Sequence, residues 1–131
     1  MAHDMNWNRS FAVDGAPGAG VLAGYLLIAS GVNAGNAALS TAKALGFVGV
    51  TKEASDARGY VAAALAGVID VIAGSNVTAG NMIASDANGK GAPVTLINNG
   101  TTVTQVVGVA LTTALAGNTF KLLIQPQIGL S

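Results

Sequence analysis

Ionisable side chains are the residues of this sequence most able to do chemistry, and they are few and scattered. The single histidine, His3, stands in a polar segment, residues 1–10, that has no helix or strand period. A catalytic histidine must be held by a second group, and no neighbour in the sequence offers one. No spacing among the six acids requires a shared site; they are Asp4, Asp14, Glu53, Asp56, Asp70 and Asp86. We therefore expect no catalytic residue and no enzyme activity.

Cofactor and metal chemistry finds little support either. The chain has no cysteine, which excludes a thiol nucleophile and Cys-ligated zinc or iron–sulfur sites. The glycines of residues 18–24 follow G-x-G-x-x-x-G, one position longer than the dinucleotide fingerprint, and no acid follows about 20 residues later. The sequence predicts no cofactor and no metal.

Asp70 is the acid with the most unusual neighbours, because Val68, Ile69, Val71 and Ile72 surround it. A carboxylate in such a setting must be paired, hydrogen-bonded or placed at an interface. We expect a structural role, either in a turn or in an ion pair with a base such as Arg58 or Lys121.

Residues near the N-terminus are the candidates for binding a partner. Trp7 is the only tryptophan and lies in the polar segment. Tryptophan is enriched at the energetic centres of interfaces. One hypothesis makes it an anchor in a neighbouring subunit; the other folds it back onto its own domain. The proposed partner-binding residues are Met5, Trp7, Arg9 and Phe11.

The composition also favours a protein that is covered by others. Charged residues make up 9% of the chain and hydrophobic residues 51%, whereas soluble domains carry about 25% charge. Coverage by another chain is the sharper explanation for so few charges. The net charge is zero, without a basic run, so nucleic-acid binding is disfavoured. The apolar stretch Gly20 to Val32 is too short to span a bilayer, so we expect no membrane segment.

Two phrases recur in the sequence and suggest two similar β units. Val32-Asn33-Ala34-Gly35-Asn36 returns as Val77-Thr78-Ala79-Gly80-Asn81, and Val48-Gly49-Val50 returns as Val107-Gly108-Val109. We expect an N-terminal arm over residues 1–14 and a single β domain over residues 15–131. Its pseudo-repeat units would span about 20–74 and 75–131.

Turn signals and alternating strands predict an all-β fold, a small barrel or sandwich of short strands with an extended N-terminal arm. Asp86-Ala87-Asn88-Gly89 and Asn98-Asn99-Gly100 are expected to close two hairpins. Structural turns are placed at Gly35, Gly80, Asn88, Gly89, Asn99 and Gly100.

Alternation also predicts which strand faces are buried. Val103, Val107, Val109 and Leu111 are expected to face the core, and Thr102, Thr104 and Thr112 to face water. Phe120, Leu122 and Ile124 are expected in the core. Tyr60 to Ile72 is apolar on both alternating faces apart from Asp70, which indicates strand buried on both sides.

The order of these short phrases resembles the capsid decoration, or cement, proteins of tailed bacteriophages. The similarity extends over residues 20–125, through Val48-Gly49-Val50-Thr51, Gly59-Tyr60-Val61, Val77 to Ile83, Asp86 to Gly89, Val107 to Leu111 and Ala116-Gly117-Asn118. Asn36, Asn81 and Asn118 stand where the family's phrases often have an acid. The resemblance implies a small β domain on the outside of a phage head, without enzyme activity.

The resemblance further implies a homotrimer that binds the major capsid protein, holds neighbouring capsomers together and is made in the host cytoplasm. The N-terminal arm is then expected to grip the capsid or the next copy, for instance by adding a strand to a neighbouring sheet. The alternative is a head- or tail-fibre module that binds host surface carbohydrate, because a surface rich in Ser, Thr and Asn suits sugar hydroxyls.

Overall fold

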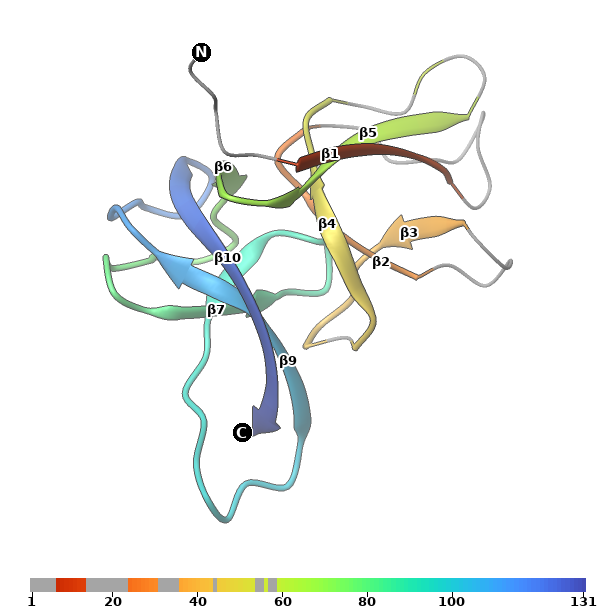
Figure 1. Cartoon of the computed structure of the whole chain (residues 1–131). Helices are drawn as coiled ribbons and strands as arrows, with labels where there is room; N and C mark the ends of the chain where they lie inside the picture. Colours follow the sequence, from red (N-terminus) through yellow and green to blue (C-terminus); the bar gives the residue numbers. More distant parts are fainter. Residues whose placement is uncertain (1–6, 14–23, 31–35, 44, 54–55, 57–58) are drawn as a thin grey trace.

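Every regular element in the described part of the chain is a β-strand. The computed structural model describes residues 7–13, 24–30, 36–43, 45–53, 56 and 59–131 (Figure 1). None of these residues belongs to a helix that could cross a membrane. The strands are β1 (Trp7–Ala12), β2 (Leu27–Ser30), β3 (Ala37–Leu39), β4 (Phe47–Thr51), β5 (Tyr60–Ala66), β6 (Val68–Ile72), β7 (Met82–Ser85), β8 (Gly91–Pro93), β9 (Val103–Ala110) and β10 (Thr119–Leu130).

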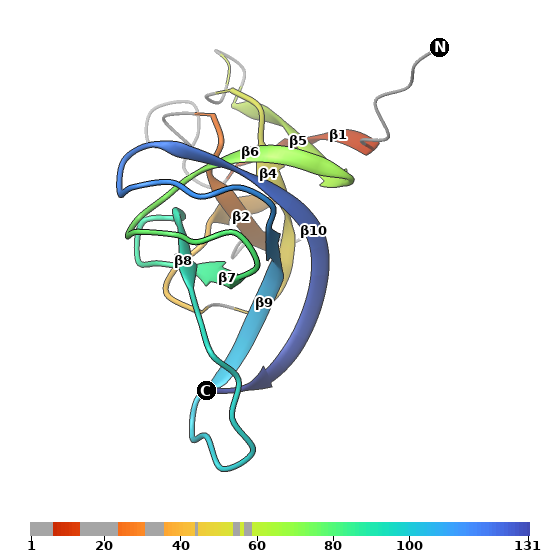
Figure 2. The ribbon, with the colours of Figure 1, turned by 90° about the vertical axis from the view of Figure 1, so that its left-hand side faces the viewer.

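The strands form two five-stranded antiparallel sheets that pack on each other. The first sheet has the order β1-β5-β4-β2-β3, and the second has the order β6-β10-β9-β7-β8 (Figures 1 and 2). Neither order returns to its starting strand, so neither sheet closes into a barrel. The predicted all-β class is confirmed, in its sandwich form.

The second sheet repeats the first strand for strand. The strands β1, β2, β3, β4 and β5 of the first sheet correspond in position to β6, β7, β8, β9 and β10 of the second. The residue pairs correspond as well: Leu27 lies opposite Val50 in the first sheet, as Met82 lies opposite Val109 in the second. Even the isolated parallel bridges match, Val13 with Ala37 and Ala73 with Gly91. The chain therefore contains one five-stranded unit twice.

This repeat differs in its boundary from the one that the phrases suggested. The first unit ends with β5 and the second begins with β6, so Gly67 separates them, instead of a boundary at residues 74 and 75. The apolar stretch from Tyr60 to Ile72 is consequently two strands, one in each sheet.

Only one of the two repeated phrases marks equivalent positions. Val48-Gly49-Val50 lies in β4 and Val107-Gly108-Val109 lies in β9, its counterpart. In the other phrase, Asn36 directly precedes β3 whereas Asn81 directly precedes β7, the counterpart of β2. Residues 32–35 of that phrase, including the predicted turn at Gly35, lie outside the described residues.

The predicted hairpin at Asp86 to Gly89 is confirmed. β7 and β8 pair on either side of it. The Asp86 carboxylate accepts hydrogen bonds from the backbone N–H groups of Asn88 at 2.8 Å and Lys90 at 2.9 Å. The carboxylate thus takes the place of a backbone carbonyl as the hydrogen-bond acceptor in the turn, as aspartate side chains commonly do.

The second predicted hairpin is only a turn. Gly100 donates its backbone N–H to the carbonyl of Ile97 at 3.2 Å, so the chain does turn across Asn98 and Asn99. However, β8 already ends at Pro93, and β9 pairs with β7 and β10 instead. Residues 94–102 therefore form a long connection between two strands that are not neighbours in the sheet.

One part of the core lies between the two sheets, and another lies on the opposite face of the first sheet. One cluster joins Leu27, Val50 and Ala64 of the first sheet to second-sheet residues that include Phe120 and Leu122. A separate cluster on the first sheet contains the buried side chains of Val13, Leu26, Ile28, Ala37, Val61 and Ala63. The prediction that Phe120, Leu122 and Ile124 belong to the core is confirmed.

Candidate functional site

The N-terminal residues proposed for partner binding lie on an edge strand of the first sheet. β1 pairs antiparallel with β5 over Trp7–Ala12, where the sequence predicts an arm. Met5 lies outside the described residues, and Trp7 is described only by its backbone position in β1. The partner strand begins at Tyr60, so no local pattern in residues 7–12 could reveal this pairing.

Of the remaining two residues, Arg9 is the one open to a partner. Phe11 is half-buried and packs against the cluster on the first sheet. The exposed Arg9 guanidinium lies 5.3 Å from the centroid of the Phe11 ring, a favourable cation–π distance. Phe11 thus contributes to the domain's own core, and Arg9 covers its ring.

The outer edge of β1 is itself a possible binding element. β1 stands at the end of the first sheet's strand order and, among the strands that the structure describes, pairs there with β5 alone. The other edge of such a strand presents unpaired N–H and C=O groups to any strand that approaches. The sheet can therefore be extended at this edge by a strand from another molecule.

Most of the large hydrophobic side chains that are exposed in the described residues belong to the second unit. Of the eleven large hydrophobic side chains exposed among the described residues, seven belong to residues 68–131. They are Val68, Ile97, Val103, Leu111, Leu115, Ile128 and Leu130. The second unit therefore offers a candidate contact surface for another molecule.

For two of these residues, the prediction that they face the core is wrong. Val103 is 52% exposed and Leu111 46% exposed, although both were expected in the core. Thr104, expected to face water, is fully buried. Its hydroxyl is satisfied by the Ser131 hydroxyl at 2.7 Å.

The physical reason for the burial of Thr104 is a contact from outside the strand. Thr104 lies opposite Gly129 in the ladder. The side chain of Leu96 occupies the space that a side chain at position 129 would need. Leu96 belongs to the long connection between β8 and β9, so this cover could not be predicted from the alternation within β9.

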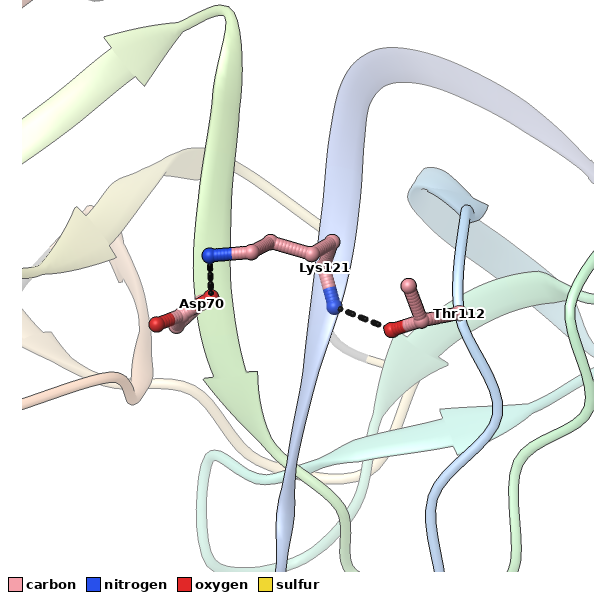
Figure 3. A network of polar contacts seen from close by, with 3 residues as sticks. All are labelled: Asp70, Thr112 and Lys121. Carbon is pink, nitrogen blue, oxygen red and sulfur yellow. Dashed lines mark hydrogen bonds and ion pairs between the residues drawn. The ribbon is translucent and has the colours of Figure 1, made fainter.

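Asp70 forms the ion pair that its surroundings predict. Its carboxylate lies 2.7 Å from the Lys121 ammonium, on the neighbouring strand β10 (Figure 3). The backbone N–H of Lys121 donates to the Thr112 hydroxyl at 2.9 Å (Figure 3). The two charged side chains are 32% and 55% exposed, so the pair is a surface feature of the second sheet.

The other acids are not gathered into a site. Glu53 and Asp56 are exposed in the connection between β4 and β5, and Asp86 holds its turn. Among the described residues no three potential ligands come together to hold a metal ion. His3, Asp4 and Asp14 lie outside this part of the chain.

Comparison with known proteins points to one fold. No known family profile matches the sequence, and no curated protein matches it. Among solved structures, the chain is similar to the head fiber gp8.5 N base of bacteriophage phi29, with a TM-score of 0.65 and 18% identity. The match covers 92% of this chain and 95% of that one. The two proteins therefore share their fold over nearly the whole length of both.

Proposed function

We propose that this protein is a structural component of a tailed-phage head, placed on the outer surface of the capsid. It binds the major capsid protein as a homotrimer and bridges neighbouring capsomers. The observation that carries this proposal is the near-complete fold match to a phage head protein. The resemblance of the order of sequence phrases to cement proteins is a second, weaker support.

The physical properties of the chain suit this role. A head filled with self-repelling DNA is pressed from inside, and an external clamp resists that pressure by adding contact area across the seams between capsomers. Such a clamp needs a rigid domain with apolar contact surface. The two packed sheets supply the rigid domain. The exposed hydrophobic residues of the second unit supply the apolar contact surface. Many copies on one shell act together, so each contact can be modest.

Binding to heads tests the proposal directly. Heads assembled without this protein are mixed with the purified chain and sedimented, and the bound fraction is measured against concentration. We expect saturable binding with a fixed number of copies per capsomer, and higher resistance of the heads to heat. Heads already carrying the protein serve as the control and should bind none. Protein that stays in the supernatant at every concentration overturns the proposal.

A second candidate is a fibre module that contacts host carbohydrate, favoured by the fact that the matched structure is a head fiber base. A glycan array with the isolated protein separates the two functions. Specific binding to a sugar class, together with no binding to heads, would favour the fibre module over the clamp.

A further inference from the structure

One row of hydrophobic side chains crosses the outer face of the second sheet. Val68 lies opposite Leu123, Leu123 opposite Val109, and Val109 opposite Met82, on the adjacent strands β6, β10, β9 and β7. Residues directly opposite each other in antiparallel strands have their side chains on the same face. Val68 is 40% exposed and the other three are half-buried. We call these four residues the outer row.

The first unit has a row in the same register on the three strands that correspond to β7, β9 and β10, and there it is buried. The counterparts are Ala64, Val50 and Leu27, paired in the same register. All three have no exposed surface, and they pack in one cluster with side chains of the second sheet. The fold therefore already uses this face of the unit for packing against another unit.

The packing between the two units cannot simply be repeated on the outer row. Within the chain, the face of the first sheet that carries Leu27, Val50 and Ala64 packs against the face of the second sheet that carries Phe120 and Leu122. The outer row lies on the other face of the second sheet. The corresponding opposite face of the first sheet is already closed, since Ile28, Val61 and Ala63 are at most 1% exposed. A second copy of the chain cannot offer that face to the outer row. A second copy must therefore meet the outer row with a surface that is still exposed, and its own second unit carries such a surface.

The charges beside the outer row suit such a contact. Asp70 and Lys121 are the only charged residues in the five strands of the second sheet. They stand two positions along the strands from Val68 and Leu123, on the same face, and pair with each other (Figure 3). Because these two groups neutralise each other within the chain, the face carries no net charge that would repel a second copy.

We infer that the outer face of the second sheet, centred on the outer row, is the surface through which copies of this chain associate. The inference rests on the proposed function and deepens it by naming the contact between subunits. The first unit, with its free β1 edge and Arg9, then remains available to the capsid.

The mass of the protein in solution, measured by light scattering over a range of concentrations, tests the inference. Wild-type protein should have the mass of three copies, as the proposed homotrimer requires. Val68→Lys places a charge in the row at an already exposed position, so it should weaken association by more than about tenfold. The matched control is Leu45→Lys, at a 49% exposed position of the first unit, and it should associate like wild type.

Cross-linking keeps the test decisive if Val68→Lys does not fold. Because the chain has no cysteine, Val68→Cys introduces a single thiol, and a bifunctional maleimide should join copies through it. Leu45→Cys should remain uncoupled. A wild-type protein that is monomeric at every concentration, or a Val68→Lys protein that associates normally, would overturn the inference.

The two proposals fail in different ways. A monomeric protein that binds heads leaves the proposed function standing and removes this interface. A protein that associates through the outer row but does not bind heads keeps the interface and removes the capsid role.

Discussion

Tyr25 and Gly80 occupy the same place in the two units and have the same unusual backbone conformation. Their φ angles are 62° and 95°. Each donates its backbone N–H to the corresponding strand, Tyr25 to the carbonyl of Thr51 at 2.6 Å and Gly80 to that of Ala110 at 2.7 Å. The unit thus requires a left-handed residue before its second strand, and the first unit meets this requirement with a tyrosine.

Replacing Gly80 by alanine should destabilise the protein by about 1 kcal/mol. The cost comes from the backbone alone, because a Cβ at this position meets no atom within 4 Å. Tyr25→Gly is the matched change: relief of the left-handed strain offsets the greater freedom of glycine in the unfolded chain. Denaturant unfolding of both variants measures the difference. Equal losses in the two variants would contradict the equivalence of the two positions.

Gly108 should tolerate substitution far less well than Gly80. A Cβ at position 108 would collide with the backbone carbonyl oxygen of Leu123 on the neighbouring strand, and a backbone atom in a ladder cannot move aside cheaply. We expect Gly108→Ala to cost about 3 kcal/mol. A Cβ added at Gly49, its counterpart, would lie 2.6 Å from the carbonyl oxygen of Ala64, so Gly49→Ala should behave alike. Thermal unfolding of both variants checks this, and a loss below that of Gly80→Ala would show that the strands can separate.

These two glycines explain why one repeated phrase marks equivalent positions and the other does not. Val-Gly-Val recurs because, at Gly49 and Gly108, β4 and β9 pass too close to the next strand to leave room for a side chain. Nothing of that kind links Asn36 to Asn81, which precede strands that are not counterparts. Sequence repeats locate a structural repeat only where the same steric requirement maintains them.

The Asp70–Lys121 ion pair should contribute little to stability. More than half of the Lys121 side chain is exposed, and exposed pairs typically contribute about 0.2–1 kcal/mol. A double-mutant cycle with Asp70→Asn and Lys121→Met should give a coupling energy within that range, smaller still at high salt. A coupling that survives high salt would mean that the pair is shielded from solvent, for instance by association between copies.

Asp86 should matter more than the ion pair, because its carboxylate accepts two backbone N–H groups in the β7–β8 turn. Asp86→Ala leaves both donors without this partner and should cost about 1–2 kcal/mol. Asp86→Asn keeps an acceptor oxygen and should recover much of the loss. Urea unfolding of the two variants compares them, and equal loss in both would assign the effect to charge instead of hydrogen bonding.

Local features of the fold could be predicted from the sequence, and distant ones could not. The Asp86 turn, the short strands and the pairing of Asp70 follow from neighbouring residues. The addition of β1 to β5 depends on a strand about fifty positions away. The burial of Thr104 depends on Leu96 and Ser131. The outer row could not be recognised either, because Val68 and Met82 are joined into one row only by residues of β10 and β9 that lie between them.

The boundary at Gly67 also determines the order in which the protein can be completed during synthesis. The first sheet needs no strand beyond β5, so it can form as soon as residue 66 has left the ribosome. Until the second half follows, however, Leu27, Val50 and Ala64 have nothing to cover them. The nascent chain therefore passes through a stage in which a completed sheet exposes a hydrophobic face to solvent. Incomplete chains released at that stage should be the most prone to aggregate.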